Sequence, residues 1–209
     1  MRTSLPHPVL AAAAALACAL ALAAQKPAPK LPLSPGTYAV FATSKGSFTA
    51  QLYPQAAPKG VANFIGLARG TQPWRNPLMG MLSSAPLYHN LLFFRTVPGF
   101  MIQTGDPLNN GTGSIGYTLP LETNHLKFDR PGRMALAQVG GDTSSRGPQI
   151  FFTLAAVPTL DKEGFLIIGQ VVEGLDVVKA ISLGPHKPGT EDQPQYPVIL
   201  RDVHIQVVK

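Results

Sequence analysis

The sequence predicts a mainly β domain: a closed, eight-stranded antiparallel β-barrel capped by two α-helices. Three observations predict this fold. About eight segments have the alternation or the short apolar runs of strands, two segments have helical apolar spacing, and most of the strands lie between the two helices. A βαβ sheet would alternate helices with strands, so this order favours an antiparallel barrel. The 20 glycines and 21 prolines supply the many turns that a barrel needs.

The composition is that of one folded domain of ordinary size. Of the 209 residues, 45% are hydrophobic and only 13% are charged, which argues against a disordered, highly charged chain. The formal net charge of +6 would allow a nucleic-acid partner. The lysines and arginines are scattered, however, without a basic run or interleaved aromatic residues. We therefore predict no nucleic-acid partner.

Residues 1–24 have the pattern of a signal peptide. Arg2 gives a weakly positive start, an Ala/Leu run follows over 10–24, and the small residues at 21 and 23 mark a cleavage site. The run is short for a transmembrane span. We expect a periplasmic or secreted protein. The alternative is an uncleaved segment that anchors the protein, and only in that case do we expect a membrane contact.

The single cysteine, Cys18, lies within this segment. A lipoprotein site would prefer Leu three residues upstream, where Ala15 stands, so lipidation is a minor alternative. Without residues 1–24 the chain has no cysteine. Disulfides, zinc–thiolate sites and cysteine nucleophiles are thereby excluded from the mature chain.

A Pro-rich linker over 25–35 precedes the predicted domain, which we place at 36–209. The domain begins with a β-hairpin, whose strands cover 37–43 and 47–53 around a Ser-Lys-Gly turn. The first helix is predicted over 58–69. Pro58 suits its first turn, Gly70 suits its C-terminal cap, and its apolar residues recur at three- and four-residue spacing.

The segment 71–88 is predicted to be a loop or a short helical excursion, because it contains three prolines, a glycine and no clean period. It is unusually apolar for a loop. We expect it to fold back onto the domain, and the alternative is an exposed apolar surface that helps to hold unfolded chains.

The rest of the chain supplies the remaining strands and the second helix. Strands are predicted at 100–103, 132–138, 149–154, 165–172 and 198–208, and a helix at 173–181. A long polar loop covers 185–197.

Several familiar chemistries lack their residues. The glycine-bearing loop 109–114 has no phosphate-binding pattern around it. Glu122, His125 and Asp129 are irregularly spaced in a loop, so we interpret them as solvated polar groups and predict no metal site. No Ser-His-Asp order or carboxylate pair indicates hydrolysis. We predict no cofactor.

The stretch Phe93–Asp106, FFRTVPGFMIQTGD, places one arginine close to aromatic, thioether and amide side chains around a Pro-Gly turn. It resembles the cyclophilin signature F-H-R-x-x-P-G-F-M-x-Q-x-G-D, with Phe94 where the family usually has His. The segments GRMALAQ (132–138) and QIFFTL (149–154) resemble two further family strands. The resemblance extends over 38–209 in the same order of elements and implies the cyclophilin fold.

The resemblance also implies a function: peptidyl-prolyl cis-trans isomerisation of X-Pro bonds in exported proteins as they fold. Its partners would be unfolded or partly folded polypeptides that contain such bonds. The catalytic residues would be Arg95, as a hydrogen-bond donor, and Gln103. Seven positions match the family's substrate-binding residues: Phe100, Met101, Ala137, Gln138, Gln149, Phe151 and Leu160.

Three positions depart from the family pattern. Phe94 and Phe165 replace polar groups at the edge of the pocket, and Thr159 stands where an aromatic residue usually sits. Because the aromatic wall is missing, we expect weak binding of cyclosporin. A non-catalytic cyclophilin-like chaperone or binding module for proline-containing segments is the alternative function. The retained Arg95 favours the enzyme.

Overall fold

The computed structural model describes residues 33–139 and 142–209, and for 139 and 142–146 it describes the backbone alone. The predicted signal peptide and residues 25–32 of the predicted linker lie outside the described residues. Residues Ser34–Lys209 form one compact unit. Among the described residues, no helix is both long and apolar enough to span a membrane.

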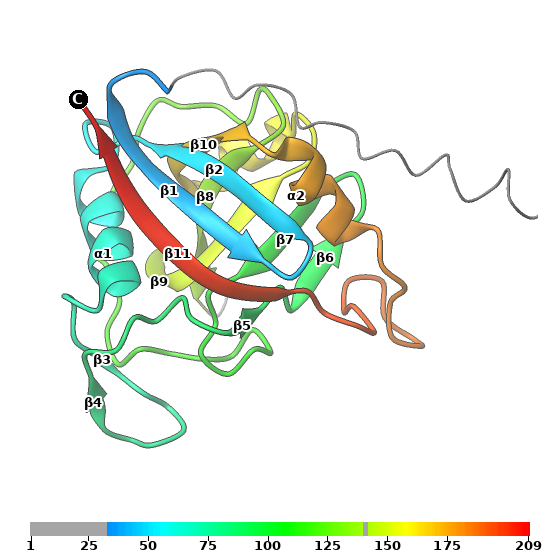
Figure 1. Cartoon of the computed structure of the whole chain (residues 1–209), viewed down its shortest axis with the longest axis horizontal. Coiled ribbons are helices and arrows are strands. Elements are labelled where there is room, and N and C mark those ends of the chain that lie inside the picture. The colour runs from blue at the N-terminus through cyan, green and yellow to red at the C-terminus, as the bar shows by residue number, and fades with distance from the viewer. Residues whose placement is uncertain (1–32, 140–141) are drawn as a thin grey trace, which may run out of the picture. The chain divides into compact units, whose positions relative to one another are not determined.

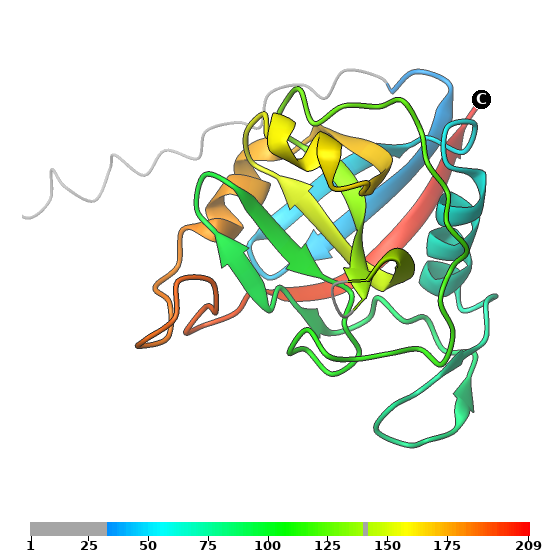
Figure 2. The same cartoon turned by 180° about the vertical axis from the view of Figure 1, so that it is seen from behind.

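The unit is built on one curled antiparallel sheet (Figures 1 and 2). Its nine strands are, in sheet order, β5 (Leu91–Leu92), β11 (Ile199–Val208), β1 (Gly36–Thr43), β2 (Gly46–Leu52), β10 (Leu166–Glu173), β8 (Arg133–Val139), β9 (Asp142–Thr153), β7 (Met101–Thr104) and β6 (Arg95–Val97). The predicted mainly β, barrel-like fold with two helices is thus confirmed, with one strand more than expected.

The barrel is not closed by a continuous ladder of backbone hydrogen bonds. The two edge strands, β5 and β6, do not pair with each other in the described sheet. The sheet curls far enough for a side chain to reach across instead: the Thr104 hydroxyl on β7 donates a hydrogen bond to the Leu92 carbonyl on β5 at 2.9 Å. Both edge strands are very short, which limits the exposed hydrogen-bonding edge.

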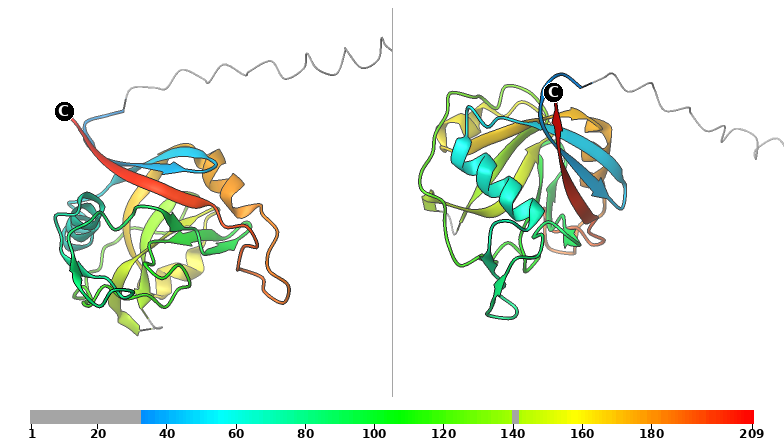
Figure 3. Two further views of the ribbon diagram at one scale, coloured as in Figure 1. Left: turned by 60° about the horizontal axis from the view of Figure 1, so that its bottom comes forward. Right: turned by 60° about the vertical axis from the view of Figure 1, so that its left-hand side comes forward.

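The two helices lie on opposite sides of the curled sheet (Figures 1 and 3). Helix α1 (Pro58–Arg69) has the predicted bounds and ends at Gly70, which adopts the left-handed conformation with φ 72° that glycine tolerates best. Helix α2 (Leu175–Ser182) begins two residues later than predicted, because Glu173 still belongs to β10 and Gly174 turns the chain with φ 74°. A short 3₁₀-helix, η1 (Pro158–Lys162), follows β9.

The core is aromatic at its centre. Phe41 and Phe48 stack with ring centroids 4.7 Å apart, and Phe152 meets both rings edge-on at 5.1 Å. Phe64 brings the apolar face of α1 onto Phe41 at 6.1 Å. Because these rings come from β1, β2, β9 and α1, one cluster ties the two halves of the sheet to the helix. This packing fixes the strands that carry the site described below.

The segment 71–88 is neither a plain loop nor a helix. It contains a second, two-stranded sheet formed by β3 (Trp74–Arg75) and β4 (Leu82–Ser83). The base of this hairpin folds back onto the domain as expected: Trp74 is buried, and its indole N–H donates to the Ala85 carbonyl at 2.9 Å. Its turn does not fold back, and the large apolar side chains there are exposed.

The acidic residues considered as a metal cluster have other partners. Glu122 accepts hydrogen bonds from the backbone N–H groups of Lys59 and Gly60, at 3.0 and 2.8 Å. It therefore caps the N-terminus of α1, which has no side-chain cap of its own. Asp129 bonds Arg130 and Arg133, and their guanidinium groups hold the pKa of its carboxyl well below the usual range. The interpretation as a solvated loop group was therefore wrong for Glu122, whereas Asp129 is exposed as expected and pairs with two arginines.

Candidate active site

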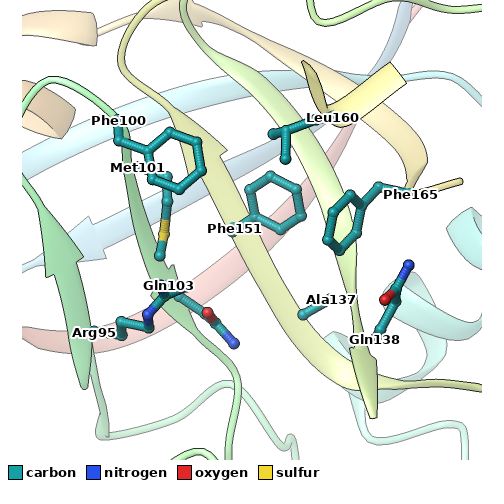
Figure 4. A pocket seen from close by; sticks show the side chains of 9 residues that line it. All are labelled: Arg95, Phe100, Met101, Gln103, Ala137, Gln138, Phe151, Leu160 and Phe165. Carbon is teal, nitrogen blue, oxygen red and sulfur yellow. The ribbon is translucent and has the colours of Figure 1, made fainter. Parts of the chain in front are cut away.

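One pocket of about 280 Å³ gathers most of the residues singled out in the sequence (Figure 4). It is lined by Arg95, Phe100, Met101, Gln103, Ala137, Gln138, Phe151, Leu160 and Phe165. Eight of these nine are among the predicted site residues, and they come from β6, β7, β8, β9, η1 and the turn before β7. The ninth, Phe165, was expected at the edge of the pocket as a departure from the family pattern. Asp192, described below, was not predicted to act there.

Strand register explains why distant residues share the pocket. Gln103 lies directly opposite Arg95 on β6 and opposite Phe151 on β9. Residues that face each other across antiparallel strands point to the same side of the sheet, so these three side chains point together. Met101 precedes Gln103 by two positions and shares its face, whereas Ile102 between them is fully buried in the core. Phe100 precedes β7, in a turn, and so escapes the alternation.

The floor of the pocket is apolar. Met101, Phe151, Leu160 and Ala137 are all buried, and Phe165 meets Phe151 edge-on with ring centroids 5.1 Å apart. Phe128 stacks behind Phe151 at 5.9 Å and fixes the ring from the other side. A hydrophobic pocket with rigid aromatic walls suits a small apolar ring better than a flexible polar chain.

Arg95 stands at the polar edge of this pocket, and its guanidinium is anchored. Its Nε donates to a carboxylate oxygen of Asp192 at 2.8 Å, and the side chain is 40% exposed. In the described part of the chain, Nη1 and Nη2 take no protein partner, so they remain available to a bound molecule. Because the Arg95–Asp192 ion pair is half-exposed, it adds little to the free energy of unfolding, and its main effect is to orient the guanidinium.

Asp192 belongs to a loop, residues 183–198, that we call the clamp loop. Two further contacts fix this loop on β6. The backbone N–H of Thr96 donates to the Asp192 carbonyl at 2.8 Å, and the His186 ring nitrogen Nε2 lies 2.9 Å from the Thr96 carbonyl oxygen. The clamp loop thus holds both the backbone beside Arg95 and its guanidinium.

A chain of amides orders the rim beside Arg95. The Gln103 amide N–H donates to Gln149 Oε1 at 2.8 Å, and the Gln149 amide N–H donates to the Gly111 carbonyl at 3.1 Å. Gln149 is therefore buried behind Gln103 and does not line the pocket. The loop that carries Gly111 is shaped by the buried carboxylate of Asp106, which accepts from the backbone N–H groups of Leu108, Asn110 and Gly111.

The backbone at Ala137 and Gln138 forms an open edge. The pairing of β8 with β10 ends at Leu136 and Leu166, and the register with β9 shifts between Leu136 and Gln138. Within the described sheet, the backbone here has no ladder partner from β10, so it can pair with an extended peptide. The Gln138 side chain turns to the Glu163 carbonyl at 2.7 Å and stays at the rim.

The departures from the family pattern have different locations. Thr159 is exposed on η1 and does not line the pocket, and Phe94 is half-buried outside it. Phe165 does line it and makes that wall apolar. Its place at the pocket agrees with the expectation from the family pattern, although it lies just before β10 begins and not within the strand.

Comparison with known proteins identifies the family. The profile of the cyclophilin type peptidyl-prolyl cis-trans isomerase family matches residues 38–205. Peptidyl-prolyl cis-trans isomerase B of Streptomyces anulatus is 39% identical over 172 residues, covering 81% of this chain and 96% of that protein. Peptidyl-prolyl cis-trans isomerase A of Mycobacterium tuberculosis is 37% identical over 179 residues, covering 83% and 94%.

A solved structure supports the fold. The cyclophilin type isomerase of Cryptosporidium parvum, crystallised in the presence of the dipeptide Ala-Pro, has a TM-score of 0.68 and 24% identity, and the match covers 82% of this chain and 99% of that one. The curled sheet, the two helices and the family match agree. The chain belongs to the cyclophilin-type peptidyl-prolyl cis-trans isomerases, the enzymes that interconvert the cis and trans forms of X-Pro bonds.

Proposed function

We propose that this enzyme isomerises X-Pro bonds in exported proteins while they fold, with Arg95 as the hydrogen-bond donor to the proline nitrogen. The observation that carries the proposal is the anchored guanidinium of Arg95 at the edge of an apolar pocket. The proline ring would occupy the pocket formed by Phe100, Met101, Phe151 and Leu160.

The reaction needs no nucleophile. Resonance holds the X-Pro amide planar, with a barrier of about 18–20 kcal/mol to rotation. Uncatalysed exchange takes tens to hundreds of seconds, slow enough to limit folding. A catalyst must bind the twisted amide better than either planar form. In the twisted form the proline nitrogen is pyramidal, and its lone pair accepts a hydrogen bond.

A guanidinium suits this task. It stays protonated, and its donors lie in a rigid plane. With Nε held by Asp192, the two Nη groups are aimed from a fixed position, which spares the entropy of ordering them at each turnover. Gln103, held by Gln149, would orient the carbonyl side of the amide or hold water beside Arg95.

The substrate would be an extended segment with proline at its centre. The open backbone edge at Ala137 and Gln138 would pair with the residues that precede proline. The Cryptosporidium relative was crystallised with Ala-Pro, which supports a proline-containing ligand for the corresponding pocket here. Thr159 is exposed and does not line the pocket, so it supplies no aromatic wall there, which supports weak binding of cyclosporin.

The export role rests on residues 1–24. Their signal-peptide pattern favours cleavage after Ala23 or Ala24 and a periplasmic or secreted enzyme. Retention of the segment would give a membrane-anchored enzyme with the same domain. The clients would then be proteins that fold outside the cytoplasm.

The experiment is the isomerisation of a proline-containing tetrapeptide by residues 25–209, compared with Arg95→Ala. Loss of one well-placed donor in a preorganised site lowers kcat by about 10²- to 10³-fold. We expect a fall in kcat/KM of at least about a hundredfold. Arg95 is 40% exposed, so the variant should fold, and its circular dichroism spectrum and melting temperature provide the control.

Two results would contradict the proposal. If Arg95→Ala kept most of the activity, Arg95 would not be the donor. If wild type and variant were equally inert but both still bound proline peptides, the domain would be a binding module for such segments and not a catalyst on them.

A further inference from the structure

The hairpin formed by β3 and β4 displays a group of apolar side chains to solvent. We call the side chains of Leu78, Met79, Met81 and Leu82 the hairpin tip; they are 77%, 72%, 65% and 72% exposed. Figures 1 and 2 show the hairpin projecting beyond the end of α1. A cluster of large exposed apolar side chains on one short turn is a feature of interaction sites.

The turn that carries the hairpin tip is well ordered by its own hydrogen bonds. Asn76 Oδ1 accepts from the backbone N–H groups of Leu78 and Met79, at 2.9 and 3.3 Å, and the Asn76 N–H donates to the Met81 carbonyl at 2.8 Å. The Arg75 guanidinium donates to the Gly80 carbonyl at 2.6 Å. The apolar side chains are thus held outward by a fixed backbone, although burying them would be favourable.

The base of the hairpin is continuous with the rim of the active-site pocket. The backbone N–H of Arg75 donates to the carbonyl of Ile115 at 2.8 Å, and Ile115 is buried. Four residues before Ile115, the Gly111 carbonyl accepts from Gln149, which in turn holds Gln103 in the pocket. A single segment, 111–115, therefore joins the pocket to the hairpin.

The reach between the two places can be bounded from the chain. Four residues from Gly111 to Ile115, one strand spacing to Arg75 and three residues to Leu78 span at most about 30 Å, at about 3.5 Å for each residue. The step from Gln103 through the Gln149 amide to Gly111 adds about 10 Å, so the pocket lies within about 40 Å of Leu78. An extended polypeptide covers that distance in about twelve residues, so one client chain can occupy both places, whereas an extended tetrapeptide spans only about 14 Å.

A membrane is a poor fit to this surface. Surface binding to a bilayer combines buried apolar side chains with nearby Lys and Arg that attract anionic lipids, and Trp and Tyr gather at the interface. Trp74 is buried under the hairpin, and Arg75 is bonded to Gly80. The tip is also small for a self-association surface, because a specific interface buries about 1,000 Å² or more. Unbranched, adaptable Met side chains suit contact with varied apolar sequences.

We propose that the hairpin tip is a second contact surface for the client, binding apolar side chains of the unfolded polypeptide whose proline occupies the pocket. The proposal rests on the isomerase function proposed above. It makes the enzyme selective for long, unfolded chains with apolar residues up to about twelve positions from proline, because such chains can make both contacts at once.

The test compares two substrates and two double variants. The substrates are a proline-containing tetrapeptide and a reduced, unfolded protein whose refolding is limited by proline isomerisation. The tip variant is Leu78→Ser with Met79→Ser, which keeps the backbone donors to Asn76. The matched control is Leu121→Ser with Val207→Ser, which removes two exposed apolar side chains, 57% and 60% exposed, that lie outside both the hairpin and the clamp loop.

We expect the tip variant to keep wild-type kcat/KM on the tetrapeptide and to lose about three- to tenfold on the unfolded protein, the scale of partly burying two such side chains. The control should match wild type on both substrates. Equal activity of the tip variant and wild type on the unfolded protein would overturn the proposal while leaving the isomerase function intact. No activity of wild type on either substrate would instead overturn the proposed function.

A binding measurement gives a second readout, without turnover. The wild-type domain should bind a permanently unfolded, carboxymethylated protein more tightly than the tip variant does, by a similar factor. Two other results would also overturn the proposal. In both, the tip variant binds and isomerises the unfolded protein as well as wild type does. In the first it loses binding to anionic lipid vesicles, which would assign the tip to a membrane, and in the second it loses concentration-dependent dimerisation, which would assign the tip to a second copy of the chain.

Discussion

Two long loops leave the sheet, and they treat their side chains in opposite ways. The clamp loop, 183–198, is mostly polar and contacts β6, where Asp192 bonds Arg95 and His186 meets the backbone of β6. The hairpin of 71–88 buries its base and turns four large apolar side chains outward. The polar side chains of the clamp loop thus orient the guanidinium of Arg95, whereas the apolar side chains of the hairpin tip lie where no part of the domain covers them. We infer that the first loop serves the chemistry and the second serves the choice of client.

The largest effect that separates the loops should come from Asp192. In Asp192→Ala the guanidinium loses its anchor and samples other orientations, so we expect kcat/KM on the tetrapeptide to fall by about tenfold. The loss is smaller than for Arg95→Ala because the donor itself remains. Steady-state isomerisation kinetics measure it directly.

Asp192→Asn distinguishes orientation from charge. The side-chain oxygen of Asn can still accept a hydrogen bond from Arg95 Nε. If Asp192 acts by orienting the guanidinium, this variant should keep most of the activity that Asp192→Ala loses. The matched control is Asp202→Asn on β11, whose side chain is 37% exposed compared with 38% for Asp192. If Asp192→Asn were as impaired as Asp192→Ala, the carboxylate would act through its charge and the positioning role would be wrong.

A smaller effect, on stability alone, is expected from the loop that caps α1. Glu122→Ala leaves the N–H groups of Lys59 and Gly60 without their acceptor. Loss of a helix N-cap costs about 1 kcal/mol, so the free energy of unfolding should fall by that amount in urea titrations. Glu122→Gln keeps one acceptor and should lose less. A change in tetrapeptide kcat/KM would show that this loop, too, contributes to the site.

Much of the fold could be predicted because its signals are local. Pro58, Gly70 and the apolar stripe between them gave both ends of α1, and alternation gave the longer strands. The short edge strands β5 and β6 have too few residues for a period to be visible. The β3–β4 hairpin was missed because each of its strands has only two residues. Its conformation depends on the burial of Trp74 more than on any sequence pattern.

Most of the pocket lining was predicted as far as the family resemblance reaches. Arg95 and Gln103 belong to the signature stretch and Phe151 to the segment 149–154, and strand register brings the three together. Asp192 lies 97 residues from Arg95 in a loop without a period, so no local signal links the two. Glu122 was assigned to solvent for the same reason: its partners are the backbone N–H groups of a helix 62 residues away.

Our main inference is that the clamp loop serves the chemistry and the hairpin serves the choice of client. The most direct test is to measure kcat/KM for one variant of each loop on each of two substrates. Asp192→Ala and the Leu78→Ser/Met79→Ser variant are each assayed on the tetrapeptide and on the unfolded protein. We predict that Asp192→Ala loses the same factor on both substrates, because it affects the chemical step, and that the tip variant loses activity only on the unfolded protein. The account is contradicted if both variants show the same pattern across the two substrates.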